Sequence, residues 1–425
     1  MLLLLAGGLR LTAVLTVGAA PELHGDEGQY VEAAMALARG DGYPGSARPP
    51  GFPAFLAIVI HILGPDPQAL RLAQIPLSLV TVLLVFNLVL VRFGLRSAFL
   101  SGLLCAASPT LVHYVHYLWA ETLLGMLLLL TLWLLARFGS TGRVWPLVLA
   151  GLVLGGAALT REMSLIWALT AAVWIAVRSG SEGRLRHSLW FLLAVLLPIL
   201  PWTLRNYGLH RTLVLVSTTR WYPIAEGNLL ASGGDLAFRA ARIRDLRHRY
   251  YGAGDEVARE ADARRVAIET VVAEQPWWLA KKLVFNSYLL LAPTRNQMRR
   301  FGEQGWLPPS WAGWGGVLAA VEAGALVVGV GLGLAGLWLV PDGNQKELGA
   351  GLLLGFFAVY VAANATHRFR TPLLPVLLLW SGPLLSGQAR IEPWRVLGAC
   401  VTLSAFAAIV LVDLLCPPVV PFQQY

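Results

Sequence analysis

Apolar runs near the length of a membrane-spanning helix recur along almost the whole chain. The hydrocarbon core of a bilayer is about 30 Å thick, and an α-helix needs about 20 apolar residues to cross it. The pattern therefore predicts an all-α, polytopic membrane protein with about eleven transmembrane helices in a single domain over residues 1–425. The predicted spans are 2–20, 70–91, 97–115, 119–136, 145–160, 162–178, 188–204, 316–340, 347–363, 371–386 and 395–416.

Composition agrees with this fold class. Of the 425 residues, 56% are hydrophobic and 13% are charged, and the mean hydropathy is +0.63; a soluble domain carries about twice that share of charge. The net charge of +9 would suggest nucleic acid for a soluble protein, but here the basic residues flank spans, so we expect membrane lipids and no nucleic acid as partners.

The first apolar run contains Arg10 and lacks a basic start, which favours a retained helix over a signal peptide. The three cysteines lack paired spacing and indicate neither a disulfide nor a metal site.

Basic residues between the spans predict the orientation. With a cytoplasmic N-terminus, the loops after even-numbered spans hold ten basic residues: Arg92, Arg96, Arg137, Arg143, Arg178, Arg184, Arg186, Lys346, Arg390 and Arg395. The short loops on the other side hold Arg161, Arg368 and Arg370. Because cytoplasmic loops carry the excess of Lys and Arg, this orientation is favoured.

Two long segments then lie outside the cytoplasm, 21–69 and 205–315. In the first, apolar and small residues recur at helical spacing over 30–38, which predicts a short helix lying along the membrane. The apolar piece at 52–64 is too short to span and is interpreted as interfacial or re-entrant. In the second segment, the charged stretch 255–274 predicts a solvated helix. Neither segment has room for a large soluble catalytic domain, so we expect any chemistry at the outer membrane face.

Asp26 and Glu27 stand side by side at the start of the first segment, so their side chains diverge. A carboxylate near an apolar boundary suits a general base, because partial desolvation raises its proton affinity. Asp26 also suits the N-cap of the helix that follows, and on local sequence alone the cap is the commoner role.

Glu121, in "HYVHYLWAET", lies just inside the outer end of the fourth span. An ionisable group within a span is a functional candidate by default. His113 or His116 would satisfy this carboxylate if its role were purely structural.

Several arginines lie on the predicted outer side, where the excess of basic residues in cytoplasmic loops makes them unexpected, or at the outer ends of spans: Arg48, Arg161, Arg205, Arg368 and Arg370. Guanidinium groups gathered at a membrane edge suit phosphate, which they bind through paired, charge-assisted hydrogen bonds. Each arginine alone is explained by snorkelling to lipid headgroups or by pairing with an acid such as Glu162. As a set they indicate a phosphate site.

The sequence contains no nucleotide-binding motif and no zinc motif. We therefore expect no cofactor; a divalent cation is compatible with the acidic residues, but no ligand spacing indicates one. The donor in a group-transfer reaction would have to come from the membrane as a lipid-linked phosphate.

Seven stretches follow one another in a fixed order relative to the predicted spans: "DEGQY", "RPPGFPAFLA", "WAET", "LTRE", "PWTLRNY", "STTRWYPIAEGN" and "HRFRTPLLP". In this order they resemble the GT-C superfamily of integral membrane glycosyltransferases, particularly the branch with protein O-mannosyltransferases and the lipid A aminoarabinose transferase. They cover essentially the whole chain, and their order relative to the spans carries the resemblance more than any single motif.

The resemblance implies an inverting transferase that moves a sugar from a polyprenyl-phosphate carrier to a hydroxyl or phosphate acceptor. The family's first-loop aspartate, assigned as the base, falls on Asp26, with Glu27 beside it. Glu121 is expected to orient the acceptor, support the base or bind a cation. The residues expected to hold the donor phosphate are Arg48, Arg161, Arg205, His367, Arg368 and Arg370. The Ala-, Leu-, Arg- and Gly-rich composition points to a bacterium, so we expect a bacterial plasma membrane, with the active site facing the periplasm or exterior as the orientation predicts.

The donor sugar and the acceptor stay open, and the acceptor is a protein, a lipid or an envelope polysaccharide. Some relatives carry a soluble domain after the last span, whereas this sequence ends at "VPFQQY". The alternative functions are a multi-span transporter and a flippase-like envelope-assembly protein. A transporter usually shows internal repeats and charges near the middle of the bilayer, whereas the suspicious charges here cluster at outer span ends.

Overall fold

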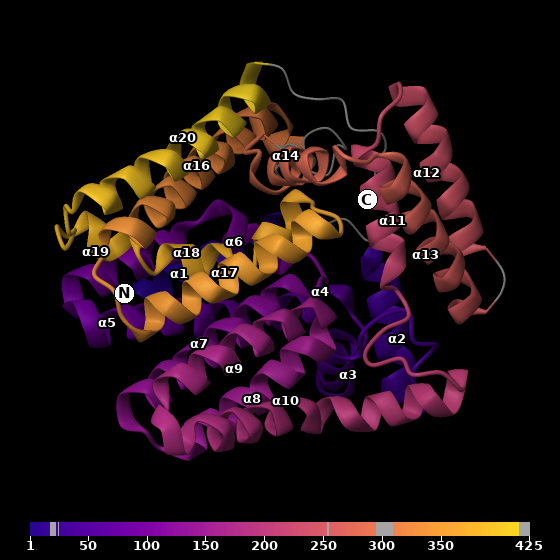
Figure 1. The fold of residues 1–425 in the computed structure, drawn as a ribbon, viewed down its shortest axis with the longest axis horizontal. Helices are drawn as coiled ribbons and strands as arrows, with labels where there is room; N and C mark the ends of the chain where they lie inside the picture. The colour runs from indigo at the N-terminus through magenta and orange to yellow at the C-terminus, as the bar shows by residue number, and fades with distance from the viewer. Residues whose placement is uncertain (18–22, 24, 253–254, 295–308, 416–425) are drawn as a thin grey trace.

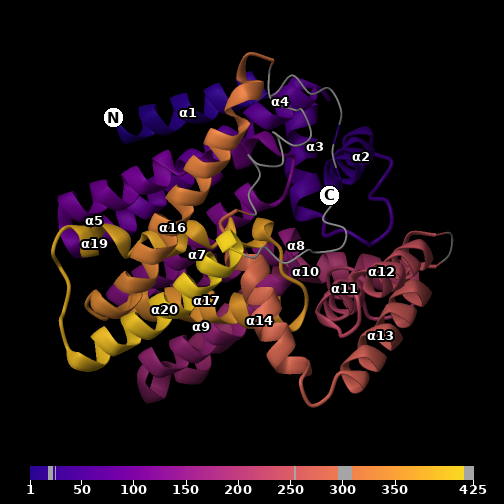
Figure 2. The ribbon, with the colours of Figure 1, turned by 90° about the horizontal axis from the view of Figure 1, so that it is seen from above.

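The computed structural model describes residues 1–17, 23, 25–252, 255–294 and 309–415, and all regular structure in these ranges is helical (Figure 1, Figure 2). The α-helices are α1 (Leu2–Val17), α2 (Asp26–Arg39), α3 (Gly51–Leu63), α4 (Pro67–Leu72), α5 (Gln74–Ala107), α6 (Pro109–His113), α7 (Glu121–Thr141), α8 (Val144–Thr160), α9 (Leu165–Arg178), α10 (Gly180–His210), α11 (Trp221–Ala231), α12 (Leu236–Tyr251), α13 (Glu256–Ala273), α14 (Trp278–Leu291), α16 (Gly315–Leu339), α17 (Asn344–Ala362), α18 (Leu374–Leu378), α19 (Ser381–Leu385) and α20 (Pro393–Leu415). Short 3-10 turns are η1 (Tyr114–His116), η2 (Glu162–Ser164), η3 (Pro309–Trp314) and η4 (His367–Arg370). The predicted all-α class is confirmed; parts of the first span and of both long segments lie outside the described residues.

The prediction of eleven spans is not confirmed. In the described part of the chain, five helical stretches are long and apolar enough to cross a membrane: Pro67–Ala107, Glu121–Thr141, Gly183–His210, Gly315–Leu339 and Pro393–Leu415. Shorter apolar helical stretches occur at Leu2–Thr16, Gly51–Leu63, Val144–Thr160 and Leu374–Leu385, the last of which comprises α18 and α19. Each of the eleven predicted spans overlaps at least one helix, long or short, which agrees with a polytopic membrane protein.

Helix α5 reverses direction at Gly94, whose φ of 80° and ψ of 178° are not helical. A Cβ on Gly102 would lie 3.6 Å from Cδ2 of Phe86, whereas a straight helix would separate these residues by about 24 Å. The two halves of α5 therefore fold back on each other and match two of the predicted spans. The second half ends at Ala107, before Pro109, and not at residue 115.

The span predicted at 371–386 is wrong as a continuous helix, because α18 and α19 are two short helices. Pro383 has no N–H to donate to the preceding turn, and its ring obstructs the carbonyl there. The break lets Gly382 lie against α5, where a Cβ would overlap the carbonyl oxygen of Ser97.

Three apolar clusters hold the molecule together. The largest joins α5, α7, α8, α9, α10, α16 and α17, and α16 lies beside α20 along one edge (Figure 1). A second joins α2 and α3 to the segment before α7. A third lies within α11, α12 and α13, which form a group at one end of the molecule (Figure 1).

The helices predicted within the two long segments are confirmed. Helix α2 covers the predicted stretch 30–38 and ends at Gly40, whose φ of 81° suits glycine. Helix α13 covers the charged stretch 255–274, and Oδ2 of Asp255 caps it by accepting a hydrogen bond from the Ala258 N–H at 3.1 Å.

Two glycines let the elements around the first segment approach closely. A Cβ on Gly51, at the start of α3, would lie 2.6 Å from Oγ1 of Thr160 and 2.9 Å from the carbonyl oxygen of Leu159. A Cβ on Gly125, in α7, would lie 3.4 Å from Cα of Pro372. The first contact brings α3 to the end of α8, and the second brings α7 to the turn that follows η4.

We predict that Gly51→Ala destabilises the protein by about 1–3 kcal/mol, because the added methyl group would overlap the backbone of α8. The measurement is the thermal unfolding midpoint in detergent. The matched control is Gly156→Ala, which lies in α8 itself, since no atom lies within 4 Å of a Cβ there. Equal midpoints for the two variants would contradict the predicted overlap.

Candidate active site

Five predicted site residues form a continuous chain of alternating charges. Oδ1 of Asp26 accepts a hydrogen bond from Nη2 of Arg48 at 2.5 Å, and Oδ2 accepts one from Nη1 of Arg368 at 2.8 Å. Nε of Arg368 donates to Oε1 of Glu121 at 2.5 Å, and Arg161 donates to the same oxygen. Arg368 therefore lies between the two carboxylates, with Arg48 and Arg161 at the ends.

Asp26 is the first residue of α2 and not its N-cap. The N-cap is Gly25, and the Asp26 carboxylate is bound by the two arginines described above. The capping interpretation of Asp26 is therefore wrong, because ion pairs with distant residues outweigh the local backbone N–H groups.

Glu121 and Arg161 meet because α7 begins where α8 ends. Glu121 is the first residue of α7, and Arg161 is the extended residue that follows α8. The interpretation that Arg161 pairs with Glu162 is wrong, since its guanidinium reaches across to Glu121. Adjacent residues of an extended segment point away from each other, and Glu162 instead accepts a hydrogen bond from Oγ of Ser217 at 3.1 Å.

The turn η4 sends neighbouring side chains in different directions, because a 3-10 turn rotates about 120° per residue. Arg368 points to the two carboxylates, whereas Nη1 of Arg370 donates to the carbonyl oxygens of Leu290 and Ala292 at 3.2 and 2.8 Å. Arg370 is thus hydrogen-bonded to the end of α14, whereas Arg368 belongs to the charged cluster. His367 begins the turn and is half-buried.

Each arginine of the cluster lies over an aromatic ring. Cζ of Arg368 is 4.1 Å from the ring centroid of Trp119, Cζ of Arg161 is 4.7 Å from that of Phe369, and Cζ of Arg48 is 5.8 Å from that of Tyr30. These contacts fix the guanidinium planes and add cation–π attraction. Sequence reasoning missed the aromatic residues, although they stand in the same motifs, "WAET" and "HRFR".

Arg205 holds the loop that carries Arg48. Its guanidinium donates to the carbonyl oxygens of Tyr43 and Gly45 at 2.5 and 2.6 Å, and to Oγ of Ser46 at 2.9 Å. These three hydrogen bonds hold the Arg205 guanidinium to the loop 43–46, outside the charged cluster.

Glu27 points away from Asp26 into the protein. Its side chain is 1% exposed, Oε1 accepts a hydrogen bond from the Leu118 N–H at 2.7 Å, and Oε2 lies 4.0 Å from Nη2 of Arg71. These contacts tie α2 to the segment before α7, so Glu27 helps place the helix that begins with Asp26.

The cluster is deep at Glu121 and open at Asp26. The Glu121 side chain is 1% exposed, whereas those of Asp26 and Arg48 are 18% and 25% exposed. Burial alone would raise the pKa of Asp26, but the guanidinium groups of Arg48 and Arg368 outweigh burial and hold this pKa well below its usual range. A ligand entering from the open side meets Asp26 and Arg48 first.

Three atoms of the cluster are buried and have no hydrogen-bond partner among the described residues: Nη2 of Arg368, Nε of Arg161 and Oε2 of Glu121. Two free donors and a free acceptor suit a ligand with both phosphate and hydroxyl groups. The described residues contain no group of three His, Cys, Asp or Glu side chains that could hold a metal, and the absence of a metal site stays a prediction.

Comparison with known proteins identifies the fold. A family model described as dolichyl-phosphate-mannose-protein mannosyltransferase matches residues 47–204. The chain is similar to ArnT from Cupriavidus metallidurans bound to undecaprenyl phosphate, with 16% identity and a TM-score of 0.53, over 95% of this chain and 63% of that one. It is also similar to the archaeal oligosaccharyltransferase AglB from Archaeoglobus fulgidus in complex with an inhibitory peptide and a dolichol-phosphate, with 13% identity and a TM-score of 0.50, over 100% of this chain and 56% of that one. No curated protein matches the sequence.

The chain is an integral membrane protein with the fold of the GT-C glycosyltransferases, as the order of its motifs predicted. It spans less than two thirds of the length of ArnT and of AglB. The matched family region contains Arg48, Glu121 and Arg161, whereas Asp26 and Arg368 lie outside it.

We predict that the stability deficit of Asp26→Asn shrinks in acid. A carboxyl whose pKa is lower in the folded state contributes stability above its unfolded pKa of 3.8, and this stability is lost as the pH falls toward the folded value. The unfolding midpoint of Asp26→Asn should lie below that of the wild type at pH 7, and the two should converge as the pH falls below about 4. A deficit that stays constant over this range would contradict the double ion pair of Asp26.

Proposed function

We propose that this protein is an inverting glycosyltransferase that moves a sugar from a polyprenyl-phosphate donor to a cell-envelope acceptor on the extracytoplasmic face of a bacterial plasma membrane. The GT-C fold supports the reaction class. The undecaprenyl phosphate bound to ArnT and the dolichol-phosphate bound to AglB support the class of donor.

The charge balance of the cluster is the observation that carries this proposal. Three guanidinium groups face two carboxylates, so the cluster has one positive charge in excess. A sugar linked to a lipid through a phosphodiester has one negative charge. Binding of the donor phosphate would make the site neutral, which favours this ligand in a pocket of low dielectric.

The proposed reaction is a single displacement. Asp26 takes the proton of the acceptor hydroxyl while that oxygen forms a bond to the anomeric carbon on the face opposite the phosphate. The bond between the anomeric carbon and the phosphate oxygen breaks, and its electron pair stays on the phosphate. Arg48 and Arg368 stabilise the negative charge that develops on the leaving phosphate.

Donor binding would also activate the base. With both oxygens held by arginines, Asp26 has a low pKa and is a weak base. A phosphate that takes over hydrogen bonds from Arg48 and Arg368 removes the interactions that lower this pKa. Asp26 would therefore become a competent base when the donor is in place, which limits activation of water in the empty site.

The other predicted residues receive supporting roles in this proposal. Oε2 of Glu121, the free acceptor atom, would receive a hydrogen bond from the acceptor or the sugar. Arg161 holds Glu121 in place through their ion pair. Glu27 and Arg205 position α2 and the Arg48 loop, while His367 and Arg370 remain candidates for contact with the donor.

We predict that Asp26→Asn lowers turnover by about 10²–10⁴-fold while the protein still binds polyprenyl phosphate, because the amide cannot accept the proton. Turnover would be measured by mass spectrometry of envelope lipids and glycans from a deletion strain that expresses each variant. Binding would be measured by crosslinking to a photoactivatable polyprenyl phosphate. Comparison of the deletion strain with the wild type identifies the sugar and the acceptor.

Glu27→Gln is the neighbouring control. Its unfolding midpoint should fall, because Glu27 holds α2 in place, but the turnover of the folded protein should fall much less than that of Asp26→Asn. Full glycan transfer by Asp26→Asn would exclude this residue as the base. An unchanged envelope in the deletion strain, combined with failed uptake of a solute, would favour a transporter.

We predict that the acid limb of the pH profile moves when the donor is bound. The profile of kcat/KM for the donor reports the free enzyme, and that of kcat reports the donor complex. The acid limb of kcat should lie at higher pH than that of kcat/KM, because the phosphate shares the arginines that lower the pKa of Asp26 in the free enzyme. Coincident limbs in purified, reconstituted protein would contradict activation of the base by the donor.

A further inference from the structure

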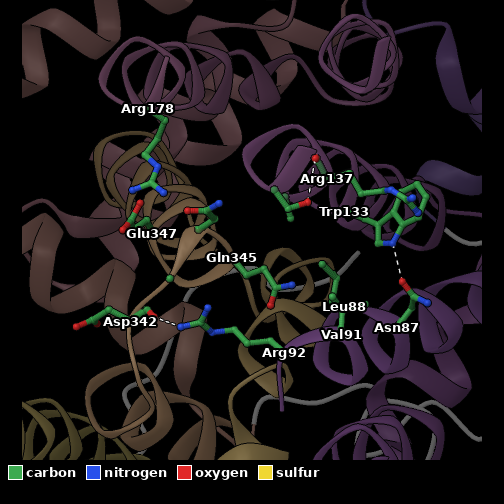
Figure 3. A pocket seen from close by; sticks show the side chains of 14 residues that line it. Asn87, Leu88, Val91, Arg92, Trp133, Arg137, Arg178, Asp342, Gln345 and Glu347 are labelled. Atoms are coloured by element: carbon green, nitrogen blue, oxygen red, sulfur yellow. Dashed lines mark hydrogen bonds between the residues drawn. The ribbon is translucent and has the colours of Figure 1, made fainter. Parts of the chain in front are cut away.

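A cavity lies at the other end of helix α7 from the charged cluster. Its volume is about 680 Å³, within the range of small-molecule sites, and it lies between α5, α7, α9 and the start of α17 (Figure 3). Glu121 begins α7, and Arg137, which lines the cavity, lies about 24 Å further along the same helix. The cavity and the proposed active site are thus separated by most of the thickness of a membrane core.

Three guanidinium groups line this cavity, those of Arg92, Arg137 and Arg178. In the described part of the chain, none of them has a carboxylate within ion-pair distance. Two carboxylates also line the cavity. That of Asp342 is held by Arg395 and by Nζ of Lys346 at 3.1 Å, so its charge is compensated from outside the cavity.

The second carboxylate, that of Glu347, is directed to a neutral donor. Its Oε2 accepts a hydrogen bond from Nε1 of Trp174 at 2.8 Å. Three positive charges are therefore opposed by one negative charge within the cavity, which gives it affinity for anions.

Two of the three arginines are held in place before any ligand binds. Cζ of Arg137 lies 4.9 Å from the ring centroid of Trp133, whose Nε1 donates to Oδ1 of Asn87 at 2.7 Å (Figure 3). Arg92 donates to the backbone carbonyl of Asp342 and lies against Gly343, where a Cβ would overlap the guanidinium. Such preorganisation lowers the entropic cost of binding.

The remaining wall is apolar and continues onto the outer face of α5. Leu88, Val91, Trp133 and Ala136 line the cavity beside the arginines. The Val91 side chain is 77% exposed, as is expected of a residue that faces lipid. A soluble anion would gain nothing from this wall, whereas a lipid would place its acyl chains along it.

We propose that this cavity binds the phosphate headgroup of an anionic glycerophospholipid from the leaflet opposite the active site. Basic pockets between transmembrane helices bind anionic headgroups in this way. The guanidinium groups of Arg92, Arg137 and Arg178, which line different sides of the cavity (Figure 3), supply the positive charge that attracts the headgroup, and the acyl chains lie against Val91. The lipid would tie α5, α7 and α17 together at the end opposite the active site.

The test is native mass spectrometry of the full-length protein in detergent with either phosphatidylglycerol or phosphatidylcholine. The wild type is expected to bind phosphatidylglycerol about tenfold more tightly than phosphatidylcholine. The double variant Arg137→Gln/Arg178→Gln should lose this preference. The matched control is Arg143→Gln/Arg390→Gln, which removes two exposed arginines from the same predicted side of the membrane but outside the cavity, and it should keep the preference.

Three results would overturn the proposal: equal binding of the two lipids by the wild type, equal loss of preference in both double variants, or displacement of phosphatidylglycerol by millimolar inorganic phosphate. The last result would assign the cavity to a soluble anion. Thermal unfolding midpoints measured without added lipid verify that both double variants are folded. None of these results depends on glycan transfer, so a failure here is distinct from a failure of the proposed function.

Discussion

The position of one guanidinium group, that of Arg368, determines whether the carboxylates of Asp26 and Glu121 can lie close together. Without it, Asp26 and Glu121 would repel each other in a setting where the Glu121 side chain is 1% exposed. Removing one partner from a buried ion pair costs about 3–5 kcal/mol, because it leaves the other charge without compensation. The Trp119 ring and the 3-10 geometry of η4 orient this guanidinium, and Gly125 lets α7 approach the turn that follows η4.

Sequence patterns reached the residues of the cluster through topology, because Arg48, Arg161 and Arg368 lie where positive charge is otherwise disfavoured. They could not separate Arg368 from Arg370 or Asp26 from Glu27. In both pairs the two residues lie close in the chain but point in different directions, and only the tertiary structure selects which one faces the site. Arg205 shows the same limit, since its donors are taken by a loop about 160 residues earlier in the chain.

Hydropathy along the sequence predicted where the helices lie. It did not predict where a helix is interrupted or which polar side chains are buried within it. A window averages over about 20 residues, so the break at Pro383 and single acids within apolar helices have little weight in it. Glu322 in α16 accepts a hydrogen bond from Thr110 at 2.8 Å, and Asp413 in α20 accepts one from Tyr288 at 2.8 Å. Both acids were missed, and both connect helices that are distant in the chain.

The residues of the charged cluster are synthesised at different times, because they lie far apart in the chain. Asp26 and Glu121 each pair with an arginine encoded nearby, 22 and 40 residues further on, whereas Arg368 follows Glu121 by 247 residues. At ribosomal rates of about 5–20 residues per second, about ten to forty seconds pass between the synthesis of Arg161, which completes the second pair, and that of Arg368. In the proposed function, the excess positive charge that attracts the donor phosphate is therefore the last of the five charges of the cluster to be synthesised.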